Sequence, residues 1–394
     1  MDKIKLGDLC IPSAGQIKED ADELIDYIDI SSVDNVTKKV TGFQTMSFGE
    51  SPSRARKAVK KGSILVSTVR PNLNAVAMLE EDTPNISVAS TGFCILDCKD
   101  NVDNRFVFNF CKSKTFIDDL VSRATGASYP AVSDKIVRSA LVPNYTYEEQ
   151  CNISEILDKV SKVIEDRKAE LLALDDLIKA RFVELFGDPV ANPMKWPVKK
   201  LKDLSVQINS GNTPKGGSEN YVEDGITFFR SQNVWKDRLE MDDIAYIDAK
   251  THASMKRSSL KHGDILMTKT GRINTENSSL GRAALYDGED DMANVNGHVY
   301  FIRLKEGVNN KFVLRILVSP EYRDLIRSVC VGGIDKRQLN KEHIEDFPII
   351  CPPSDAIDDY VAFVEQVDKS KVAVQKALDE TQLLFDSLMQ QYFG

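Results

Sequence analysis

The chain has 394 residues, of which 42% are hydrophobic and 28% are charged; this composition is typical of a soluble globular protein with two or three domains. No apolar run approaches the roughly 18–20 residues that span a bilayer, and the N-terminus MDKIKLGDLC lacks the apolar segment of a signal peptide. We therefore expect no membrane association and a cytoplasmic location. The net charge of −9 argues mildly against nucleic acid, although basic residues cluster at 54–61, 199–202 and 256–261.

Cysteines and histidines show no pattern of a metal or catalytic site. The seven cysteines are scattered and form no CxxC pair, which predicts reduced, structural thiols in a cytosolic chain. The four histidines are isolated and all lie in the second half. The motifs GxxxxGK[ST], HExxH and GxSxG are absent, as is a GxGxxG after a strand. We predict no catalytic residues and no bound metal.

Short apolar runs in the first 146 residues predict strands. GSILVSTV (62–69) is short, apolar and β-branched after a glycine turn, as is GDILMTKT (263–270) in the second half, where GHVYFIRL (297–304) is another such run. The segment NRFVFNFCKSKTFIDDLVSRA (104–124) has a helical pattern. Strands mixed with helices predict an α+β unit.

A long helical pattern begins near residue 153. Apolar residues recur there in steps of four and three for more than four heptads, which is typical of a coiled-coil seam. Arg167 and Arg181 interrupt the seam. A helix of about 40 residues would be roughly 60 Å long. The predicted interface residues of this helix are Ile153, Leu157, Val160, Ile164, Leu171, Leu174, Ile178 and Leu185.

A second long helical pattern ends the chain. A shift of 207 residues carries Ile153 to Tyr360 (360 − 153) and Phe186 to Phe393. Neither apolar stripe is stable in water, so we predict that the two helices pack on each other. The alternative is that each stripe is buried against its own domain. The predicted interface residues of the second helix are Tyr360, Val364, Val367, Val374, Leu378, Phe385 and Leu388.

The same short motifs occur in the same order in both halves. LGDL (6–9), KKGSILVST (60–68) and VASTGFCIL (88–96) resemble LKDL (201–204), KHGDILMTK (261–269) and ANVNGHVYF (293–301). Chance matches would not keep this order, so the sequence predicts a tandem repeat of a globular unit followed by a long helix. The three prolines of DPVANPMKWPVK (188–199) predict a linker between the copies.

Polar loops follow matching strands in the two halves, and their residue types suit DNA. Arg can donate two hydrogen bonds to guanine, and Asn or Gln can pair with adenine. The alternative for any one of these residues is an ordinary solvated loop. The candidate DNA-binding residues are Ser31, Ser32, Arg70, Asn72, Asn74, Ser128, Tyr129, Lys135, Arg230, Gln232, Asn233, Lys269, Arg272, Asn274, Lys336, Arg337 and Gln338.

The sequence resembles the specificity (S) subunits of type I restriction-modification systems over essentially its whole length. The tandem layout and the GDIL motif, here also GSIL, carry the resemblance, together with ALVPNYTYEEQCNISEIL (140–157) and ELFGDPVANPMKW (184–196). The second half departs from the family pattern, because PSDAIDDYV (353–361) has no Glu-Gln at the start of its helix.

The resemblance implies an α+β fold class: a tandem repeat of two α+β target recognition domains separated by two long antiparallel coiled-coil helices with pseudo-two-fold symmetry. Target recognition domain 1 is expected at 1–146, the first long helix at 147–187, the linker with target recognition domain 2 at 188–353, and the second long helix at 354–394. Each domain would recognise one half of a bipartite, asymmetric site in double-stranded DNA. The helix pair would set the spacing of the half-sites.

The resemblance also implies a non-catalytic chain that acts through partners. Two DNA methyltransferase (M) subunits would dock on it and, in a restriction-competent complex, restriction (R) subunits as well. This chain would bind no cofactor, because S-adenosylmethionine binds the methyltransferase subunits, and ATP and Mg²⁺ bind the restriction subunits.

Three alternatives stay open at this level. The chain could be a coiled-coil protein-binding scaffold without direct base recognition, or part of a methylation-only complex. It could also be a self-contained methyltransferase or nuclease, although the sequence offers no methyl-donor or metal-carboxylate site for one.

Overall fold

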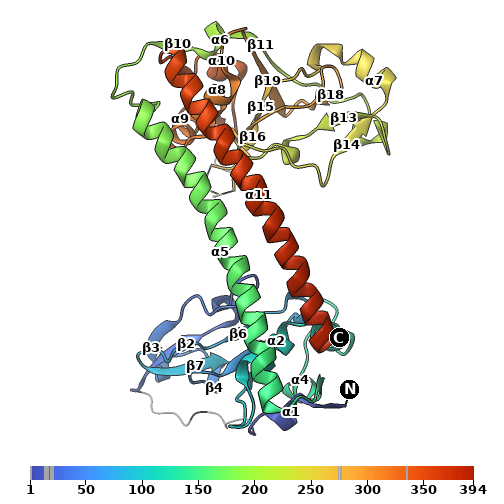
Figure 1. The fold of residues 1–394 in the computed structure, drawn as a ribbon. Coiled ribbons are helices and arrows are strands. Elements are labelled where there is room, and N and C mark those ends of the chain that lie inside the picture. Colours follow the sequence, from blue (N-terminus) through green and yellow to red (C-terminus); the bar gives the residue numbers. More distant parts are fainter. Residues whose placement is uncertain (1, 13–16, 18–21, 274, 276, 334–335) are drawn as a thin grey trace. The chain divides into compact units, whose positions relative to one another are not determined.

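The computed structural model (Figure 1) describes residues 2–12, 17, 22–273, 275, 277–333 and 336–394, and it has a mixed α/β fold. The chain divides into two compact units. Unit 1 comprises Met1–Leu171 and Val372–Gly394, and unit 2 comprises Leu172–Lys371. The division falls inside the two longest helices, α5 (Tyr147–Phe186) and α11 (Ser354–Phe393), each of 40 residues. Within the described residues, no helix combines the length and the apolar character that a membrane span requires.

Unit 1 is built on two small sheets. In the first, β2 pairs in parallel with β7, whereas the other neighbours are antiparallel. In the second, β5 lies between β6 and β8, and it is the predicted GSIL strand. The order of the first sheet is β3 (Gln44–Ser47), β2 (Leu24–Ile28), β7 (Ile86–Ser90) and β4 (Ala55–Ala58); the second has β6 (Val76–Met78), β5 (Ile64–Ser67) and β8 (Phe93–Leu96), and β1 (Lys3–Lys5) pairs with β9 (Leu141–Pro143).

The helical segment 104–124 of unit 1 is two helices rather than one. Ser113 separates them, because its extended backbone ends α2 and its hydroxyl oxygen accepts a hydrogen bond from the Phe116 amide (3.2 Å), which caps α3. The helices and short 3-10 turns of unit 1 are α1 (Leu6–Leu9), η1 (Ile30–Ser32), η2 (Phe48–Glu50), η3 (Pro71–Leu73), α2 (Asn104–Lys112), α3 (Lys114–Ser122) and α4 (Asp134–Arg138).

The C-terminal end of α11 completes the core of unit 1. Phe393 is fully buried, and its ring centroid lies 5.3 Å from that of Phe106 and 5.9 Å from that of Phe110, both on α2. The Tyr145 hydroxyl donates to the carbonyl of Tyr392 at 3.5 Å. The aromatic-glycine ending of the chain therefore has a packing role.

Unit 2 contains sheets with the same kinds of pairing. Strand β13 pairs in parallel with β18, and β15, the predicted GDIL strand, lies between β17 and β19. One four-stranded sheet has the order β12 (Tyr221–Val222), β14 (Ala245–Ile247), β13 (Ile226–Phe229) and β18 (Ala293–Val295), and the other has the order β11 (Ser205–Ser210), β19 (Val299–Leu304), β15 (Ile265–Thr268) and β17 (Ala283–Leu285). A three-stranded sheet has the order β16 (Thr270–Gly271), β21 (Arg337–Gln338) and β20 (Val331–Gly332). A further pair consists of β10 (Val198–Lys200) and β22 (Pro348–Ile350).

The helices of unit 2 again include a pair separated by one serine. Ser319 ends α8, caps α9 through its hydroxyl, and precedes Pro320, which suits the first turn of a helix. The helices and 3-10 turns are α6 (Leu201–Leu204), η4 (Gly217–Asn220), η5 (Ser231–Asn233), α7 (Ala249–Ser254), η6 (Lys256–Ser258), α8 (Asn310–Val318), α9 (Pro320–Val329) and α10 (Lys341–Glu345).

An aromatic cluster joins the ends of α5 and α11 that belong to unit 2. The ring centroids of Phe182 and Phe186 each lie 5.6 Å from that of Tyr360, and Phe186 also packs on Phe312 of α8 at 5.0 Å. Further along the helices, the Lys371 ammonium donates to Asp175 at 2.6 Å. Phe186 and Phe393, the last residues of α5 and α11, are thus both buried in cores.

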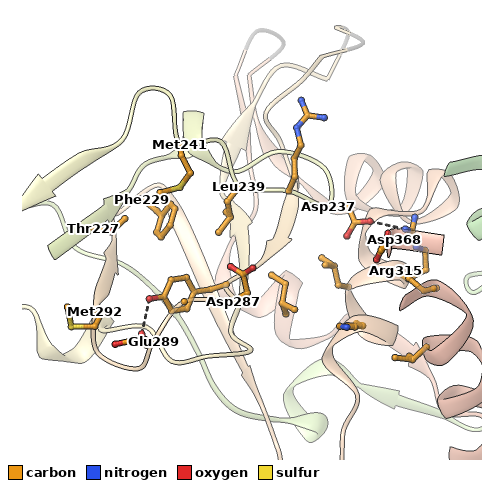
Figure 2. Close-up of a pocket in the computed structure, with 18 of the residues that line it drawn as sticks. Thr227, Phe229, Asp237, Leu239, Met241, Asp287, Glu289, Met292, Arg315 and Asp368 are labelled. Carbon is orange, nitrogen blue, oxygen red and sulfur yellow. Dashed lines mark hydrogen bonds and ion pairs between the residues drawn. The ribbon is translucent and has the colours of Figure 1, made fainter. Parts of the chain in front are cut away.

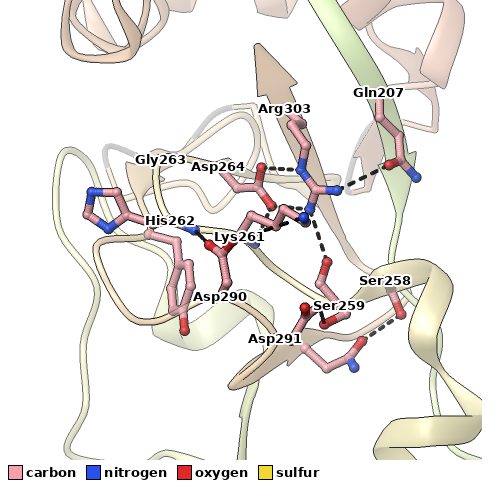
Figure 3. Close-up of polar contacts among 12 residues, drawn as sticks. Gln207, Ser258, Ser259, Lys261, His262, Gly263, Asp264, Asp290, Asp291 and Arg303 are labelled. Carbon is pink, nitrogen blue, oxygen red and sulfur yellow. Dashed lines mark hydrogen bonds and ion pairs between the residues drawn. The ribbon is translucent and has the colours of Figure 1, made fainter. Parts of the chain in front are cut away.

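The GDIL strand is fixed by a buried ion pair (Figure 3). The carboxylate of Asp264 is 1% exposed and accepts hydrogen bonds from Arg303 Nε (2.9 Å), Arg303 Nη2 (2.7 Å) and the Lys261 amide (2.8 Å). Burial raises the pKa of Asp264, and Arg303 opposes that shift. The corresponding GSIL strand of unit 1 uses a different pair, in which the Ser63 hydroxyl donates to Asp97 at 2.5 Å.

Candidate nucleic-acid interface

In unit 1, two of the predicted polar loops meet at the end of β5. Val69 and Ala131 form an antiparallel bridge, and the Arg70 amide donates to the carbonyl of Pro130 at 2.7 Å. The guanidinium carbon of Arg70 lies 4.7 Å from the centroid of the Tyr129 ring, which is 67% exposed. An exposed Arg-aromatic pair of this kind offers both a hydrogen-bond donor and a stacking surface to a nucleic acid.

The backbone around Arg70 is held in an unusual conformation. Arg70 has φ 50° and Asn74 has φ 46°, so both residues occupy the left-handed region that side chains rarely adopt. Such strain clusters at ligand-binding sites. Asn74 is held from two sides, since Lys38 Nζ donates to its carbonyl (2.6 Å) and its amide donates to the Lys112 carbonyl (3.4 Å). Asn72 lies exposed between them.

The remaining candidates of unit 1 lie in η1, in the loop before Ala131 and in the first turn of α4. Ile30 of η1 packs against Gly92, whose carbonyl accepts hydrogen bonds from the amide (2.8 Å) and hydroxyl (2.9 Å) of Thr68. These contacts place η1 beside the strand that leads to Arg70. In η1, Ser31 is exposed and Ser32 is half-buried, and Ser128 and Lys135 are exposed further along the chain.

Unit 2 brings its corresponding loops together through a small sheet. β16 pairs with β21, and the Leu339 amide donates to the Lys269 carbonyl at 2.9 Å. The Lys269 ammonium lies 5.8 Å from the Tyr300 ring centroid. Arg272, Lys336 and Gln338 are exposed, whereas Arg337 is half-buried. Asn274 lies outside the described residues.

The third group of candidates, at η5, is largely engaged within unit 2. The Arg230 guanidinium forms an ion pair with Asp243 at 3.1 Å, and Gln232 donates to the same carboxylate at 2.6 Å. Hydrogen bonds from Gln232 and Arg230 lower the pKa of Asp243. An acidic partner reduces the attraction of this turn for phosphate.

Asn233 requires a correction, because its side chain is buried and fully used. It is 1% exposed, its oxygen accepts from the Arg230 amide (3.0 Å), and its nitrogen donates to the carbonyls of Glu240 (3.1 Å) and Asp243 (2.9 Å). These bonds build the turn, so Asn233 is excluded from the DNA contacts proposed below.

The basic segments noted in the sequence are also partly neutralised. Arg54 pairs with Asp29 at 2.7 Å, and Lys61 pairs with Glu81 at 2.9 Å. Lys200 and Lys202 both contact Asp346, at 2.8 and 3.1 Å. Exposed pairs like these are weak, but they reduce the positive charge available to a DNA backbone.

Sequence reasoning missed two residues that support these loops. One is Lys38, which holds the Asn74 carbonyl. The other is Arg282, which is 8% exposed, lies 3.9 Å from the Trp235 ring centroid, and donates to the carbonyls of Ser278 (2.9 Å) and Asn277. Arg282 thereby supports the loop that carries Arg272. No sequence pattern distinguishes either residue, since both act through hydrogen bonds to backbone carbonyls, which any residue type provides.

A cavity of about 810 Å³ lies in unit 2 between α8, α11 and the loops at 237–241 and 285–292 (Figure 2). Its wall carries the ion pair of Arg315 with Asp237 (2.8 Å) together with apolar side chains such as Met241. Charged residues of both signs line it, with acids in the majority: Asp237, Asp287, Glu289, Asp368, Arg238, Lys311 and Arg315. This mixture does not favour a phosphate. Among the described residues, no group of three or more His, Cys, Asp or Glu side chains is placed to hold a metal ion.

Comparison with known proteins defines the class of this chain. Residues 193–381 match the family model of the type I restriction modification DNA specificity domain. The matched region includes β15, the predicted GDIL strand, and the loops around Lys269 and Lys336. Unit 2 therefore carries a domain of a class that confers DNA sequence specificity.

Curated relatives extend the similarity to most of the chain. It is 24% identical over 355 residues to the type I restriction enzyme MjaIX specificity subunit of Methanocaldococcus jannaschii, a match that covers 84% of this chain and 76% of the relative. It is 23% identical over 221 residues to the HindI specificity subunit of Haemophilus influenzae, which covers 52% of this chain and 48% of that one.

Two solved structures share the fold over the whole chain. A chain from a study of complex assembly and conformational transition of the type I R-M system aligns with a TM-score of 0.64 at 21% identity, covering 100% of this chain and 97% of the other. The S subunit of a type I system from M. genitalium aligns with a TM-score of 0.56 at 14% identity, covering 100% and 96%.

The family model over residues 193–381 and the two relatives all indicate a type I restriction-modification specificity subunit, and the fold is similar to that of the solved structures. Specificity subunits are the non-catalytic components of these systems, in agreement with the prediction of a chain without catalytic residues.

Proposed function

We propose that this chain recognises a bipartite, asymmetric DNA target through two quasi-equivalent domains, 1–146 and 188–353, whose separation is set by the helices 147–187 and 354–394. One observation carries the proposal. In each unit, the loop that follows the central GSIL or GDIL strand is joined by backbone pairing to a later polar loop, at Val69–Ala131 (131 − 69 = 62 residues apart) and at Thr270–Gln338 (338 − 270 = 68 residues apart).

Matching strand pairings support a tandem repeat. The parallel pair β2–β7 corresponds to β13–β18, and the antiparallel β5–β8 corresponds to β15–β19. The serine-separated helix pairs α2–α3 and α8–α9 follow in the same order. Two copies of one topology are what a pair of DNA-recognising domains requires, since each half-site then meets an equivalent surface.

The proposed DNA contacts come from the exposed ends of these loops. Arg70 stacked on Tyr129 characterises the first domain, whereas Lys269 and Arg272 occupy the matching loop of the second. Different side chains at matching positions support an asymmetric target. The proposed contacts are Ser31, Ser32, Arg70, Asn72, Asn74, Ser128, Tyr129, Lys135, Arg230, Gln232, Lys269, Arg272, Lys336, Arg337 and Gln338, with Asn274 retained from the sequence alone.

Burial along α5 and α11 supports an antiparallel helix pair. All the predicted interface residues are buried or half-buried, from Ile153 and Leu157 in unit 1 to Ile178, Tyr360 and Val367 in unit 2. The contacts of Asp175 with Lys371 and of Phe186 with Tyr360 join residues whose numbers rise on one helix and fall on the other. A pair of packed helices resists bending better than a single helix, so it would keep the separation of the two domains fixed.

Exposed apolar residues on the two long helices support docking of partner subunits. Leu172 is 66% exposed, Val372 71% and Leu383 70%, and apolar groups left in water on a charged helix are typical of protein interfaces. We propose that two methyltransferase subunits cover them, with restriction subunits joining in a restriction-competent complex. S-adenosylmethionine, ATP and Mg²⁺ would then bind the partners, and a DNA target would place the complex in the cytoplasm.

Methylation mapping with reciprocal variants tests the proposal. The chain is expressed with its methyltransferase partner, and modified sites are located by long-read sequencing. Arg70→Ala should relax one half-site and leave the other intact, and Arg272→Ala should do the reverse, so that each variant is the control for the other. Unchanged motifs in both variants would reject these contacts. Absence of DNA binding by the complete complex would favour a protein-binding scaffold instead.

A further inference from the structure

Two cysteines of unit 1 face each other across a β-bridge. Cys10 and Cys98 form an isolated antiparallel bridge. The hydrogen bonds of this bridge lie on either side of the pair, from the Ile11 amide to the Asp97 carbonyl (2.9 Å) and from the Lys99 amide to the Leu9 carbonyl (3.0 Å). The cysteines are therefore a non-hydrogen-bonded pair, in which Cα atoms are about 4.5 Å apart and side chains are closest. A disulfide requires a Cα separation of about 4.4–6.8 Å, so the bridge meets this condition.

Two further thiols share the same core, but the backbone does not pair them with a cysteine. Cys94 lies opposite Val66 of β5, and Cys111 is on α2. Cys94 and Cys111 are completely buried and Cys10 is 3% exposed, whereas Cys98 is half-buried. Within this group of four, Cys98 is thus the sulfur that a small oxidant in solvent can approach.

The surroundings of the pair lower the pKa of the Cys10 thiol. A hydrogen bond from the Cys98 thiol lowers the pKa of Cys10; burial opposes this effect, and Arg138 and Lys99 reinforce it. The same hydrogen bond raises the pKa of Cys98. Arg138 is held beside the bridge, since its guanidinium donates to the carbonyls of Ile11 and Ile95, both at 3.0 Å. When an oxidant converts the thiolate of one cysteine to a sulfenic acid, a neighbouring thiol condenses with it to form a disulfide.

We propose that Cys10 and Cys98 are a redox-active pair that forms a reversible intramolecular disulfide in the presence of hydrogen peroxide. The sulfur of Cys98, the more exposed of the two cysteines, attacks a peroxide oxygen as its thiolate, the O–O bond breaks, and the departing hydroxide takes the proton that Cys98 has lost, which gives water and a sulfenic acid on Cys98. The sulfur of the other cysteine attacks the sulfenic sulfur, the S–O bond breaks, and a second water leaves. Two thiols lose two electrons, and one peroxide is reduced to two waters.

The disulfide would close a loop from residue 10 to residue 98 that includes β2, β5, β7 and Arg70. It would link the backbone at Leu9–Ile11, which follows α1, covalently to the backbone at Asp97–Lys99, which follows β8. Transient cytosolic disulfides usually serve catalysis or redox sensing. In this chain, oxidation would stabilise the folded state of unit 1, which contains the Arg70 loop.

Peptide mapping without reduction tests the pair in the full-length chain. The protein is treated with hydrogen peroxide, its remaining thiols are alkylated, and the digest is analysed by mass spectrometry. The expected product is a peptide pair linking Cys10 to Cys98, lighter than the two reduced peptides by two hydrogen atoms, which dithiothreitol separates. Cys98→Ser should abolish this product. Cys151→Ser, at another half-buried cysteine in unit 1, should leave it unchanged.

Three results would overturn the proposal. They are a linkage of Cys98 to Cys94 or to a second chain, oxidation of Cys98 to sulfinic acid without a linked peptide, and a linked peptide that survives in Cys98→Ser. The wild-type map decides the question even if the serine variant does not fold. Amide hydrogen exchange at Ile11 and Lys99 gives a second measure, since both amides should exchange at least tenfold more slowly in the oxidised protein.

Discussion

The boundary between the two units falls inside both long helices, after residue 171 in α5 and after residue 371 in α11. Helix length can therefore be changed there while the core of each unit keeps its own contacts. We consider the duplication of residues 168–171 in α5 together with 368–371 in α11, which lengthens both helices by the same four residues. If the helix pair sets the spacing of the half-sites, this variant should recognise the same half-sites at a larger spacing.

The size of the change follows from helix geometry. Four residues lengthen an α-helix by about 6 Å and turn it by about 400°, which is about 40° beyond one full turn. Each base pair of B-DNA adds about 3.4 Å and about 34–36° in the same right-handed sense. If the helix pair lies along the DNA, one extra base pair matches the added rotation and two match the added length. We therefore expect a spacer that is longer by one or two base pairs.

A duplication of seven residues at the same places is the matched control. It adds about 10.5 Å, the length of about three base pairs, but leaves the helix about 20° short of two full turns. Three base pairs rotate DNA by about 100°, so the two domains would be out of phase by about 120°. This variant should methylate poorly at every spacing, although its heptad pattern is better preserved than that of the four-residue variant.

Long-read methylation mapping with the methyltransferase partner measures the outcome, and urea denaturation shows whether each variant is folded. An unchanged spacer in the four-residue variant would refute the proposal that helix length sets the half-site spacing. Altered half-site sequences would refute the separation of recognition from spacing. Equal activity of the two variants would show that rotation between the domains is not constrained.

Three further predictions follow from single residues. Arg70→Ala should weaken discrimination at one base pair by about 1–3 kcal/mol, measured by competition binding of the assembled complex to matched and mismatched DNA. Arg303→Met leaves Asp264 buried without its cation and should cost about 3–5 kcal/mol in urea denaturation, at the lower end because Arg303 is 22% exposed. Burial raises the pKa of Asp264 in the folded state, so its ionisation disfavours folding, and stability is lost as pH rises from the unfolded pKa of about 4 through the folded pKa. Without Arg303, the loss of stability should be larger at pH 7 than at pH 5. An equal loss at both pH values would contradict the ion-pair account. Phe393→Ala should destabilise unit 1 by about 3–5 kcal/mol, whereas Leu383→Ala, at a residue that is 70% exposed, should change stability by less than about 0.5 kcal/mol.

Features that depend on neighbours in sequence were predictable from the sequence alone. The steps of four and three from Ile153 and from Tyr360 indicated long helices, and α5 and α11 are 40 residues each. The runs GSIL and GDIL indicated strands that became β5 and β15. The sequence left one or two helices open for each unit, and the break at Ser113 could not be located from it, because a cap depends on one backbone angle rather than on a periodic pattern.

Features that depend on contacts between distant residues were decided only by the tertiary structure. The sequence places Arg70 and Tyr129 in separate loops, and a backbone bridge at Ala131 brings them together. In the sequence, Asn233 is one more polar residue of a predicted loop, whereas its side chain is buried in the folded chain. Cys10 and Cys98 have no spacing that marks them as a pair. Hydrophobic periodicity determines which face of an element is buried, but the choice of strand partner and register is made by the chain as a whole, and that choice determines which side chains meet.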